Sequence, residues 1–263
     1  MVLNRVMYSE YCKKYRMLWR YLMSCSIDRY QVVEEICSLR GYDYNRMAGV
    51  LLKAGFIRLD PDKFNIKHIM YGYEEMGIFN KSENFILGNG GYIFPVMDML
   101  GNVVALIEWN ANARNDESRK YITTPSKFFS KAAMLYGMEQ LASTGIGKKY
   151  VMVEGIFDSL SVRALGIPCL AYMGVESSRY KEALYALFRG IVAIPDGDAV
   201  GREVIERDRW KLPSNGKYLR WRNTSGIAVK DIDDICKYYD PEDLKELFRE
   251  AFNEKQKVVS VDL

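Results

Sequence analysis

The sequence predicts an α/β fold in which a parallel sheet is flanked by helices. Between residues 150 and 240, short runs of β-branched and aromatic residues alternate with helical patterns, and this order builds parallel strands joined by crossover helices. Acidic residues follow three of the expected strands, and functional sites gather at the carboxyl ends of parallel strands. A smaller mixed α+β subdomain and an N-terminal helical module are expected to precede this sheet.

The composition is that of a folded protein. Hydrophobic residues make up 49% of the 263 residues, which suffices for a packed core, and the longest apolar runs are too short to span a membrane. The N-terminal residues lack the basic-then-apolar order of a secretory signal. The 5 cysteines are dispersed and never form a C-x-x-C pair, so neither a disulfide framework nor a zinc ribbon is indicated. We therefore expect a cytoplasmic protein with no membrane association and no zinc.

Residues 1–80 have helical patterns. Asp28 is placed to cap a helix that ends at Gly41, and Asp43 is placed to cap a second helix that ends at Gly55. Two helices joined by a tight turn and followed by a short extended tail resemble a helix-turn-helix or winged-helix unit. Helix pairs of this kind are also common without any DNA-binding role, so both interpretations remain open.

Residues 81–149 are expected to form a second, basic part. Residues 92–98 and 103–109 have strand patterns separated by a turn, which predicts a hairpin. Residues 109–149 carry 7 Lys and Arg against 3 Asp and Glu, a bias that suits a polyanionic partner but equally fits a solvated surface. A helical pattern over residues 132–142 closes this part.

Residues 150–240 hold the alternating series. The expected strands cover residues 150–154, 168–173, 190–195 and 217–221, and the expected helices cover residues 156–165, 179–188 and 201–210. Residues 241–253 should form one amphipathic closing helix, after which the last residues of the chain are expected to fray.

Six carboxylates are expected to meet at one edge of this sheet, because they follow its strands. They are Glu154, Asp158, Asp196, Asp198, Asp231 and Asp233. Each pair alone could be a helix cap or an ordinary turn, but together they lie at consecutive strand ends of one sheet. Neighbouring carboxylates repel one another, so a site that keeps them ionised needs a cation such as Mg²⁺, and such sites typically serve phosphoryl or nucleotidyl transfer. Gly155 and Gly197 leave room for a sharp backbone turn and a phosphate.

The motifs VEGIFDSLS, IPDGDAVG and KDIDDI resemble the Toprim domain shared by bacterial-type primases, topoisomerases and some nucleases. Upstream, KYITTPSKFFSKAAMLYGMEQLA is similar to the basic motif of DnaG-type primases, and GGYIFPVMDMLGNVVALIEW is similar to their strand pair. The resemblance extends over about residues 85–240. This chain departs from the family in three places. It has Thr123 where the family usually has Asn, and it has Trp109 close to where the family usually has an Arg. Its cysteines also do not support the zinc-ribbon domain that usually comes before the core.

The resemblance implies that the six carboxylates bind Mg²⁺ or Mn²⁺, with Glu154, Asp196 and Asp198 as the catalytic set. It also implies nucleotide or template contacts by basic residues, namely Lys120, Lys131, Lys127, Arg119 and Arg114. A Lys ammonium is a compact point charge that suits phosphate, although an exposed loop would account for the same lysines.

The resemblance further implies a DNA primase that makes short primers on single-stranded DNA from ribonucleoside triphosphates. A replicative helicase is the expected partner, and the cytoplasm of a bacterium or of a phage-infected bacterium is the expected location. A metal-dependent Toprim nuclease and a non-catalytic replication-accessory protein are the alternatives. Four segments follow from this interpretation: a helical module at 1–80, a basic subdomain at 81–149, a Toprim catalytic domain at 150–240, and a C-terminal helix and tail at 241–263.

Overall fold

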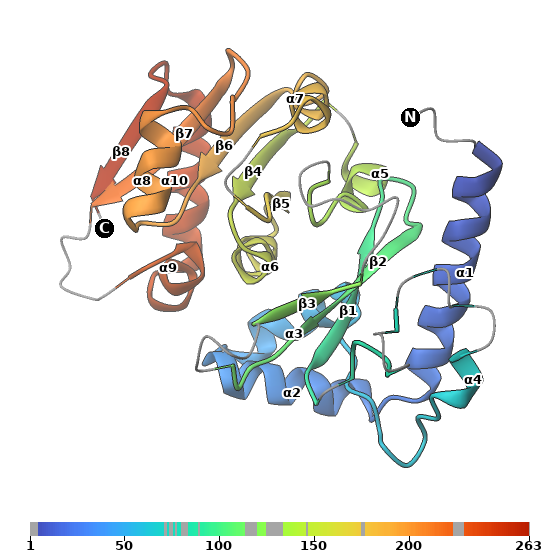
Figure 1. Cartoon of the computed structure of the whole chain (residues 1–263). Coiled ribbons are helices and arrows are strands. Elements are labelled where there is room, and N and C mark those ends of the chain that lie inside the picture. Colours follow the sequence, from blue (N-terminus) through green and yellow to red (C-terminus); the bar gives the residue numbers. More distant parts are fainter. Residues whose placement is uncertain are drawn as a thin grey trace. The chain divides into compact units, whose positions relative to one another are not determined.

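The structure is a computed structural model of the 263-residue chain. It describes residues 5–70, 73, 76, 78–79, 84–88, 90–113, 120–124, 134–145, 147–174, 177–222 and 229–262. The chain forms two compact units, Met1–Ser130 and Lys131–Leu263 (Figure 1). The finer division into four segments at residues 80, 149 and 240 stays a prediction.

The first unit begins with helices whose ends follow the sequence signals. They are α1 (Arg5–Ser24), α2 (Arg29–Arg40), α3 (Tyr44–Ala54) and the short α4 (Lys67–Met70). Asp28 caps α2 by accepting hydrogen bonds from the backbone N–H groups of the first turn, and Asp43 caps α3 in the same way. Gly41 and Gly55 end these helices at φ values of 67° and 77°, a left-handed conformation that glycine adopts without strain. Both predicted helices are thus confirmed, whereas DNA binding by this pair stays a prediction.

The first unit also contains a three-stranded antiparallel sheet in the order β1-β2-β3. Its strands are β1 (Tyr92–Met97), β2 (Val103–Trp109) and β3 (Tyr121–Thr123). The β1–β2 pair is the predicted hairpin, and Asp98 holds its turn by accepting hydrogen bonds at 2.8 Å from the N–H groups of Leu100 and Asn102. Side chains of α1, including Tyr15, Leu18 and Leu22, pack with strand residues in the buried core of this unit.

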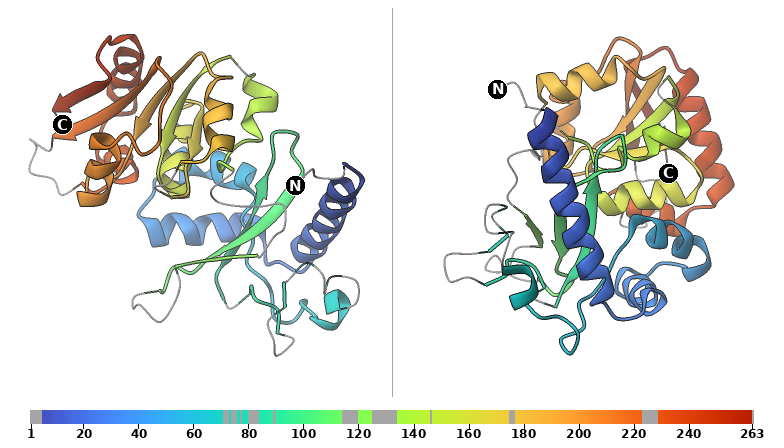
Figure 2. Two further views of the ribbon diagram at one scale, coloured as in Figure 1. Left: turned by 45° about the horizontal axis from the view of Figure 1, so that its top comes forward. Right: turned by 90° about the vertical axis from the view of Figure 1, so that its right-hand side faces the viewer.

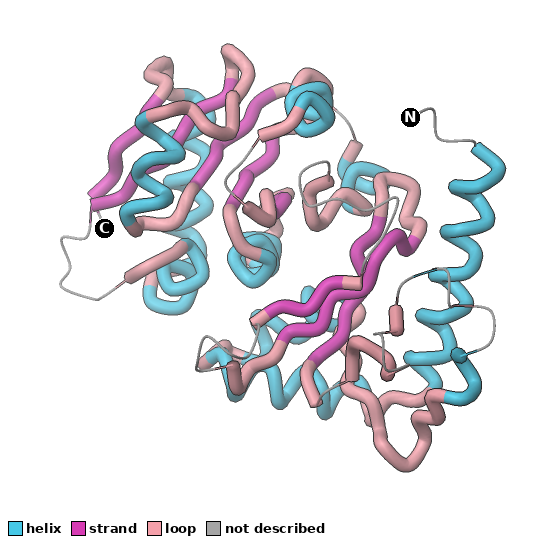
Figure 3. The backbone as a smooth tube through the Cα atoms, viewed as in Figure 1, coloured by secondary structure: helices cyan, strands magenta, loops and turns pink. Residues whose placement is uncertain are grey.

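The second unit is built on a five-stranded parallel sheet in the order β5-β4-β6-β7-β8. Its elements are α5 (Gln140–Thr144), β4 (Lys149–Val153), α6 (Ile156–Ala164), β5 (Cys169–Ala171), α7 (Arg179–Tyr185), β6 (Gly190–Ile194), α8 (Ala199–Glu206), β7 (Gly216–Arg222), α9 (Ile232–Tyr238), α10 (Pro241–Asn253) and β8 (Val258–Asp262). Helices cover both faces of the sheet (Figures 2 and 3). The predicted fold class is therefore confirmed.

The central strands of this sheet have continuous apolar sequences because both of their faces are buried. All five residues of β6 are buried, and so are the last four residues of β4. A parallel strand with helices on both faces is covered on both sides, so it carries apolar runs instead of alternating polar and apolar residues. Within the described ranges, no helix has the length and apolar content needed to cross a bilayer.

The helix expected over residues 132–142 is wrong for most of its length. Tyr136 instead forms an isolated antiparallel bridge to Ala171, with backbone hydrogen bonds of 2.9 and 3.0 Å. Gly137 then adopts a φ of 93°, which a right-handed helix excludes, and α5 begins only at Gln140. The helical spacing of apolar residues here reflects burial against β5 and not a helix.

The expected fraying of the last residues is also wrong. Val258–Asp262 form β8, which pairs in parallel with β7 from Tyr218↔Val258 to Arg222↔Asp262. The sequence VVSVD has the β-branched residues of a strand, and its three valines are half-buried. The closing helix α10 contacts β6 and β7, so this C-terminal helix and strand complete the second unit.

Candidate functional site

The six predicted carboxylates all lie at the carboxyl ends of the parallel strands. Glu154 directly follows β4, and Asp196 follows β6 after one intervening residue. Asp198 and Asp231 are the N-cap residues of α8 and α9. Asp158 and Asp233 lie in the first turns of α6 and α9.

Local chain geometry fixes these side chains. Asp198 accepts a hydrogen bond from the N–H of Gly201 at 2.9 Å, and Asp231 accepts one from the N–H of Asp234 at 3.0 Å. Each is the N-cap interaction that satisfies an unpaired donor of a helix start. The need to begin α8 and α9 at the strand ends therefore also sets two carboxylates at the rim of the sheet.

Asp158 has a different role in the geometry. One of its oxygens accepts from the N–H of Gly155 at 2.9 Å, and the other accepts from the N–H of Asp233 at 3.2 Å. A Cβ at Gly155 would collide with the Asp158 carboxylate, so the glycine makes room for this cap and not for a phosphate. The buried Asp158 side chain thus ties the start of α6 to the start of α9.

The carboxylates act on one another across three strand ends. Burial, followed by the charges of Glu154 and Asp231, raises the pKa of Asp196 from 3.8 to about 7. Burial and the charge of Asp198 raise the pKa of Glu154. Burial raises the pKa of Asp158 well above its ordinary value, and the nearest carboxylates add to this rise. The predicted convergence is visible in these mutual effects.

Two lysines that the sequence analysis did not assign partly offset this charge. The positive charge of Lys230 lowers the pKa values of Glu154 and Asp196. Lys237 forms an ion pair with Asp233, with Nζ at 2.9 Å from the carboxylate. Lys237 lies four residues after Asp233 on α9, and this helical spacing is the signal that would have identified the pair.

Asp233 is consequently paired within the protein. Its carboxylate is fully buried, it accepts a hydrogen bond from the Ser161 hydroxyl, and Lys237 neutralises it. Asp231, Asp233 and Asp234 offer oxygens within 4.8 Å of one another, but Lys237 also reaches Asp234 at 3.4 Å. Asp234 was not singled out from the sequence.

Glu154 meets the requirement for a cation ligand most clearly. Its Oε2 atom is buried and has no hydrogen-bond partner, while its environment is rich in negative charge. A buried carboxylate oxygen without a donor is costly, and a hard divalent cation is the group that its chemistry suits. The residues present therefore fit a divalent cation at the end of β4.

Only part of the basic segment falls within the described residues. Lys120 is exposed in the first unit, and its ammonium lies 5.6 Å from the centre of the Tyr121 ring. The other four basic candidates lie outside the described residues: Arg114, Arg119, Lys127 and Lys131. Their contacts with nucleotide or template stay predictions.

The comparison with protein families defines the class of the second unit. Residues 151–236 match the family described as Toprim-like, and this stretch contains all six carboxylates. The resemblance inferred from the acidic motifs is thus confirmed as a match of this stretch to the Toprim-like family.

The curated relatives are DNA primases. The chain is 30% identical over 113 residues to a DNA primase of Clostridium acetobutylicum, a match that covers 42% of this chain and 18% of the relative. It is 25% identical over 211 residues to a DNA primase of Thermotoga maritima, covering 74% of this chain and 35% of the relative. The chain therefore spans about a third or less of the length of the curated relatives it matches.

Solved structures of primase cores share the fold. A DnaG primase catalytic domain bound to ssDNA matches with a TM-score of 0.72 and 16% identity, covering 95% of this chain and 83% of that chain. The RNA polymerase domain of Mycobacterium tuberculosis primase DnaG matches with a TM-score of 0.66 and 15% identity, covering 91% and 82%. The chain therefore has the fold of a DnaG-type primase catalytic core, and the stretch that matches the Toprim-like family lies in its second unit.

Proposed function

We propose that this chain is the catalytic core of a DNA primase, which joins ribonucleotides into short primers on a single-stranded DNA template. The observation that carries the proposal is the cluster of mutually repelling carboxylates, in which a buried Glu154 oxygen has no hydrogen-bond partner. The primase relatives and the shared core fold support the same activity.

The residues that would hold a divalent cation, Mg²⁺ or Mn²⁺, are Glu154, Asp196, Asp198 and Asp231. When bound, such an ion neutralises charge on a transferring phosphoryl group and lowers the pKa of an attacking hydroxyl. Asp158 and Asp233 would position these ligands without binding the cation themselves, because their oxygens already interact with backbone N–H groups, Ser161 and Lys237.

The remaining residues of the site would position the substrate. Lys230 is exposed and its charge acts on Glu154 and Asp196, so its ammonium is placed to attract a nucleotide phosphate entering beside them. Lys120 and the basic segment around it would contact the template or the incoming nucleotide. The same proposal includes the substrates, the partner and the location: ribonucleoside triphosphates, a replicative helicase, and the cytoplasm of a bacterium or of a phage-infected bacterium.

A primer-synthesis assay tests this function. The protein is incubated with single-stranded DNA, labelled ribonucleoside triphosphates and Mg²⁺ or Mn²⁺, and the expected result is short labelled oligomers that disappear in EDTA. Asp196→Asn should abolish them, because it removes one cation ligand. Asp243→Asn is the matched control, since Asp243 is an exposed residue of α10.

Two results would contradict the proposal. Metal-dependent loss of the DNA without new oligomers would indicate a nuclease that uses the same carboxylates. Binding of DNA without synthesis or cleavage in either metal would indicate an accessory protein.

A further inference from the structure

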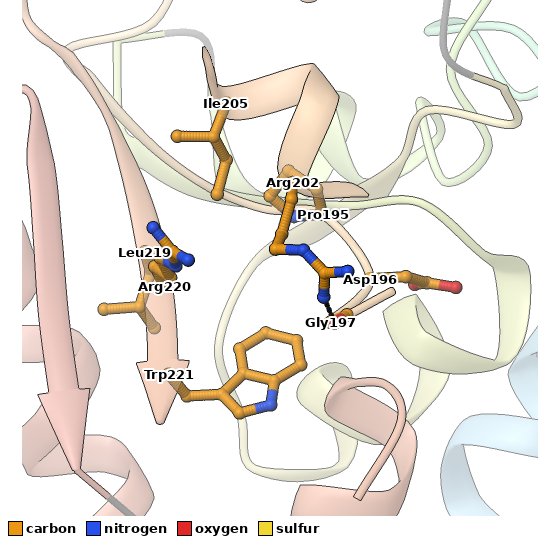
Figure 4. A pocket seen from close by; sticks show the side chains of 8 residues that line it. All are labelled: Pro195, Asp196, Gly197, Arg202, Ile205, Leu219, Arg220 and Trp221. Atoms are coloured by element: carbon orange, nitrogen blue, oxygen red, sulfur yellow. Dashed lines mark hydrogen bonds between the residues drawn. The ribbon is translucent and has the colours of Figure 1, made fainter. Parts of the chain in front are cut away.

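A pocket of about 120 Å³ lies between α8 and the end of β7, next to the turn that holds Asp196. Figure 4 shows that the Asp196 carboxylate points away from this space, whereas Arg202 and Trp221 border it. The pocket therefore adjoins the carboxylate cluster, and its lining combines two arginines and one tryptophan with mainly apolar residues.

Some exposed arginines of the second unit are ion-paired and others are not; within the described residues Arg179 and Arg189 have no ion pair, and the two arginines of this pocket share that state. By contrast, Arg249 forms an ion pair with a glutamate of its own helix, and Arg207, which lies just after α8, pairs with Glu203 of α8. In the part of the chain that the structure describes, neither Arg202 nor Arg220 is paired with a carboxylate. Arg202 donates one hydrogen bond to the Gly197 carbonyl at 2.9 Å. Most of the donors of both guanidinium groups are thus available to an anion.

Strand geometry places both arginines beside the same space. The Tyr218 hydroxyl donates to Asp208, just beyond α8, so the side chain of Tyr218 lies on the α8 side of the sheet. Arg220 comes two residues later in β7 and lies on the same side, and it lines the pocket together with Arg202 of α8. The pocket is the space that these elements enclose.

Trp221 forms an apolar wall of the pocket. It is half-buried, and a Cβ at Gly197 would lie 3.2 Å from its ring carbon Cζ2, so one edge of the ring packs on the turn between Asp196 and Asp198. The rest of the ring borders the pocket (Figure 4). An aromatic ring beside unpaired guanidinium groups is the combination by which proteins bind bases and phosphates of nucleic acid.

We propose that this pocket binds one nucleotide, with its phosphate held by Arg202 and Arg220 and its base stacked on Trp221. The inference rests on the proposed function and deepens it, because a nucleotide held here lies beside the carboxylates that would carry out the transfer. The nucleotide belongs either to the single-stranded DNA or to a free ribonucleoside triphosphate, since both offer the same phosphate and base.

Binding measured in EDTA tests the pocket without relying on catalysis. The probes are fluorescein-labelled oligothymidylate and a fluorescent ATP analogue, followed by anisotropy over a range of salt concentrations. Arg220→Ala should weaken the binding of one probe about tenfold, the usual loss of a hydrogen bond to a charged group. For the oligonucleotide it should also reduce the slope of log K against log salt by about 0.7.

Trp221→Leu should weaken the binding of the same probe, whereas Trp221→Phe should retain most of that binding because the aromatic face is kept. Arg207→Ala is the matched control, since Arg207 is an exposed arginine just after α8 that is already paired with Glu203. An effect on oligothymidylate alone assigns the pocket to the DNA strand, and an effect on the ATP analogue alone assigns it to the incoming nucleotide.

Unchanged binding of both probes by Arg220→Ala and Trp221→Leu would overturn the inference, even if the wild-type protein makes primers. Altered primer synthesis by Trp221→Leu with unchanged binding would also overturn it, because Trp221 would then only brace the turn. If Arg220→Ala and Trp221→Leu lose binding but the wild-type protein makes no primers, the nucleotide pocket is supported and only the proposed function is refuted.

Discussion

Replacing Asp196 with asparagine should stabilise the protein when no divalent cation is present. Asp196 has a pKa raised from 3.8 to about 7 by burial and by the charges of Glu154 and Asp231. At about 1.36 kcal/mol for each pKa unit, this shift corresponds to at most about 4 kcal/mol of destabilisation of the folded state by the ionised Asp196. Because the side chain is partly exposed, solvent screening reduces the expected gain to about 1–3 kcal/mol.

The sign of the pH dependence follows from proton binding. Between about pH 4 and pH 7 the folded state holds the Asp196 proton more tightly than the unfolded state, so stability falls as pH rises through this window. The destabilisation is fully present above about pH 7 and absent below about pH 4. The gain from Asp196→Asn should therefore be largest at about pH 8 and fall to about a third of that value near pH 5.

Urea unfolding in EDTA at these two pH values measures the effect. Asp243→Asn removes an exposed first-turn carboxylate of α10 and should lower stability by no more than about 1 kcal/mol, with no gain at either pH. A loss of stability in Asp196→Asn at the higher pH, or a gain of the same size at both pH values, would refute the electrostatic argument.

Four further substitutions test individual contacts in the two units. Gly201→Ala should destabilise the protein by more than about 2 kcal/mol, because the added Cβ would collide with the Asp196 backbone. Gly49→Ala in α3 has open space around it and should stabilise the protein by about 0.5–1 kcal/mol. Urea unfolding midpoints that move in the same direction for both variants would contradict this. Lys237→Met should cost about 3 kcal/mol by leaving the buried Asp233 carboxylate without its ammonium, and an unchanged melting temperature would disprove that role. Lys181 is buried and its pKa is lowered to about 8, so its burial cost is present below that pH and is relieved between about pH 8 and pH 10. Lys181→Met removes this cost together with the hydrogen bond that the ammonium donates to the Tyr172 carbonyl at 2.8 Å. Its stability relative to the wild-type protein should therefore fall by about 1–3 kcal/mol between pH 7 and pH 10, and a difference that does not change with pH would contradict the assignment.

Much of the site could be predicted because local signals and sheet topology agree. Asp198 and Asp231 are recognisable helix caps, and the apolar runs before them are recognisable strands. Parallel pairing of those strands then places their carboxyl ends on one edge whatever the details of packing. In addition to burial, the charge of Glu154 accordingly raises the pKa of Asp196, as expected for residues at neighbouring strand ends.

The features that sequence reasoning missed depend on contacts between distant segments. Tyr136 lies in a helix-like pattern, but its bridge to Ala171 replaces the helix. Val258–Asp262 gain their structure from pairing with β7, which no local pattern specifies. The contact of Trp221 with Gly197 joins a strand end to a turn more than twenty residues earlier, so only the folded chain reveals the pocket between them.

Direct titration of Mn²⁺ or Mg²⁺ into the wild-type protein and into Glu154→Gln tests the central claim, that the gathered carboxylates form a site completed by a divalent cation. Isothermal titration calorimetry should detect uptake by the wild-type protein with release of protons near neutral pH, because the ion displaces the proton held by Asp196. Glu154→Gln should weaken this uptake at least about tenfold while leaving the circular dichroism spectrum unchanged. Equal binding by both proteins, or no uptake by the wild-type protein, would contradict the account.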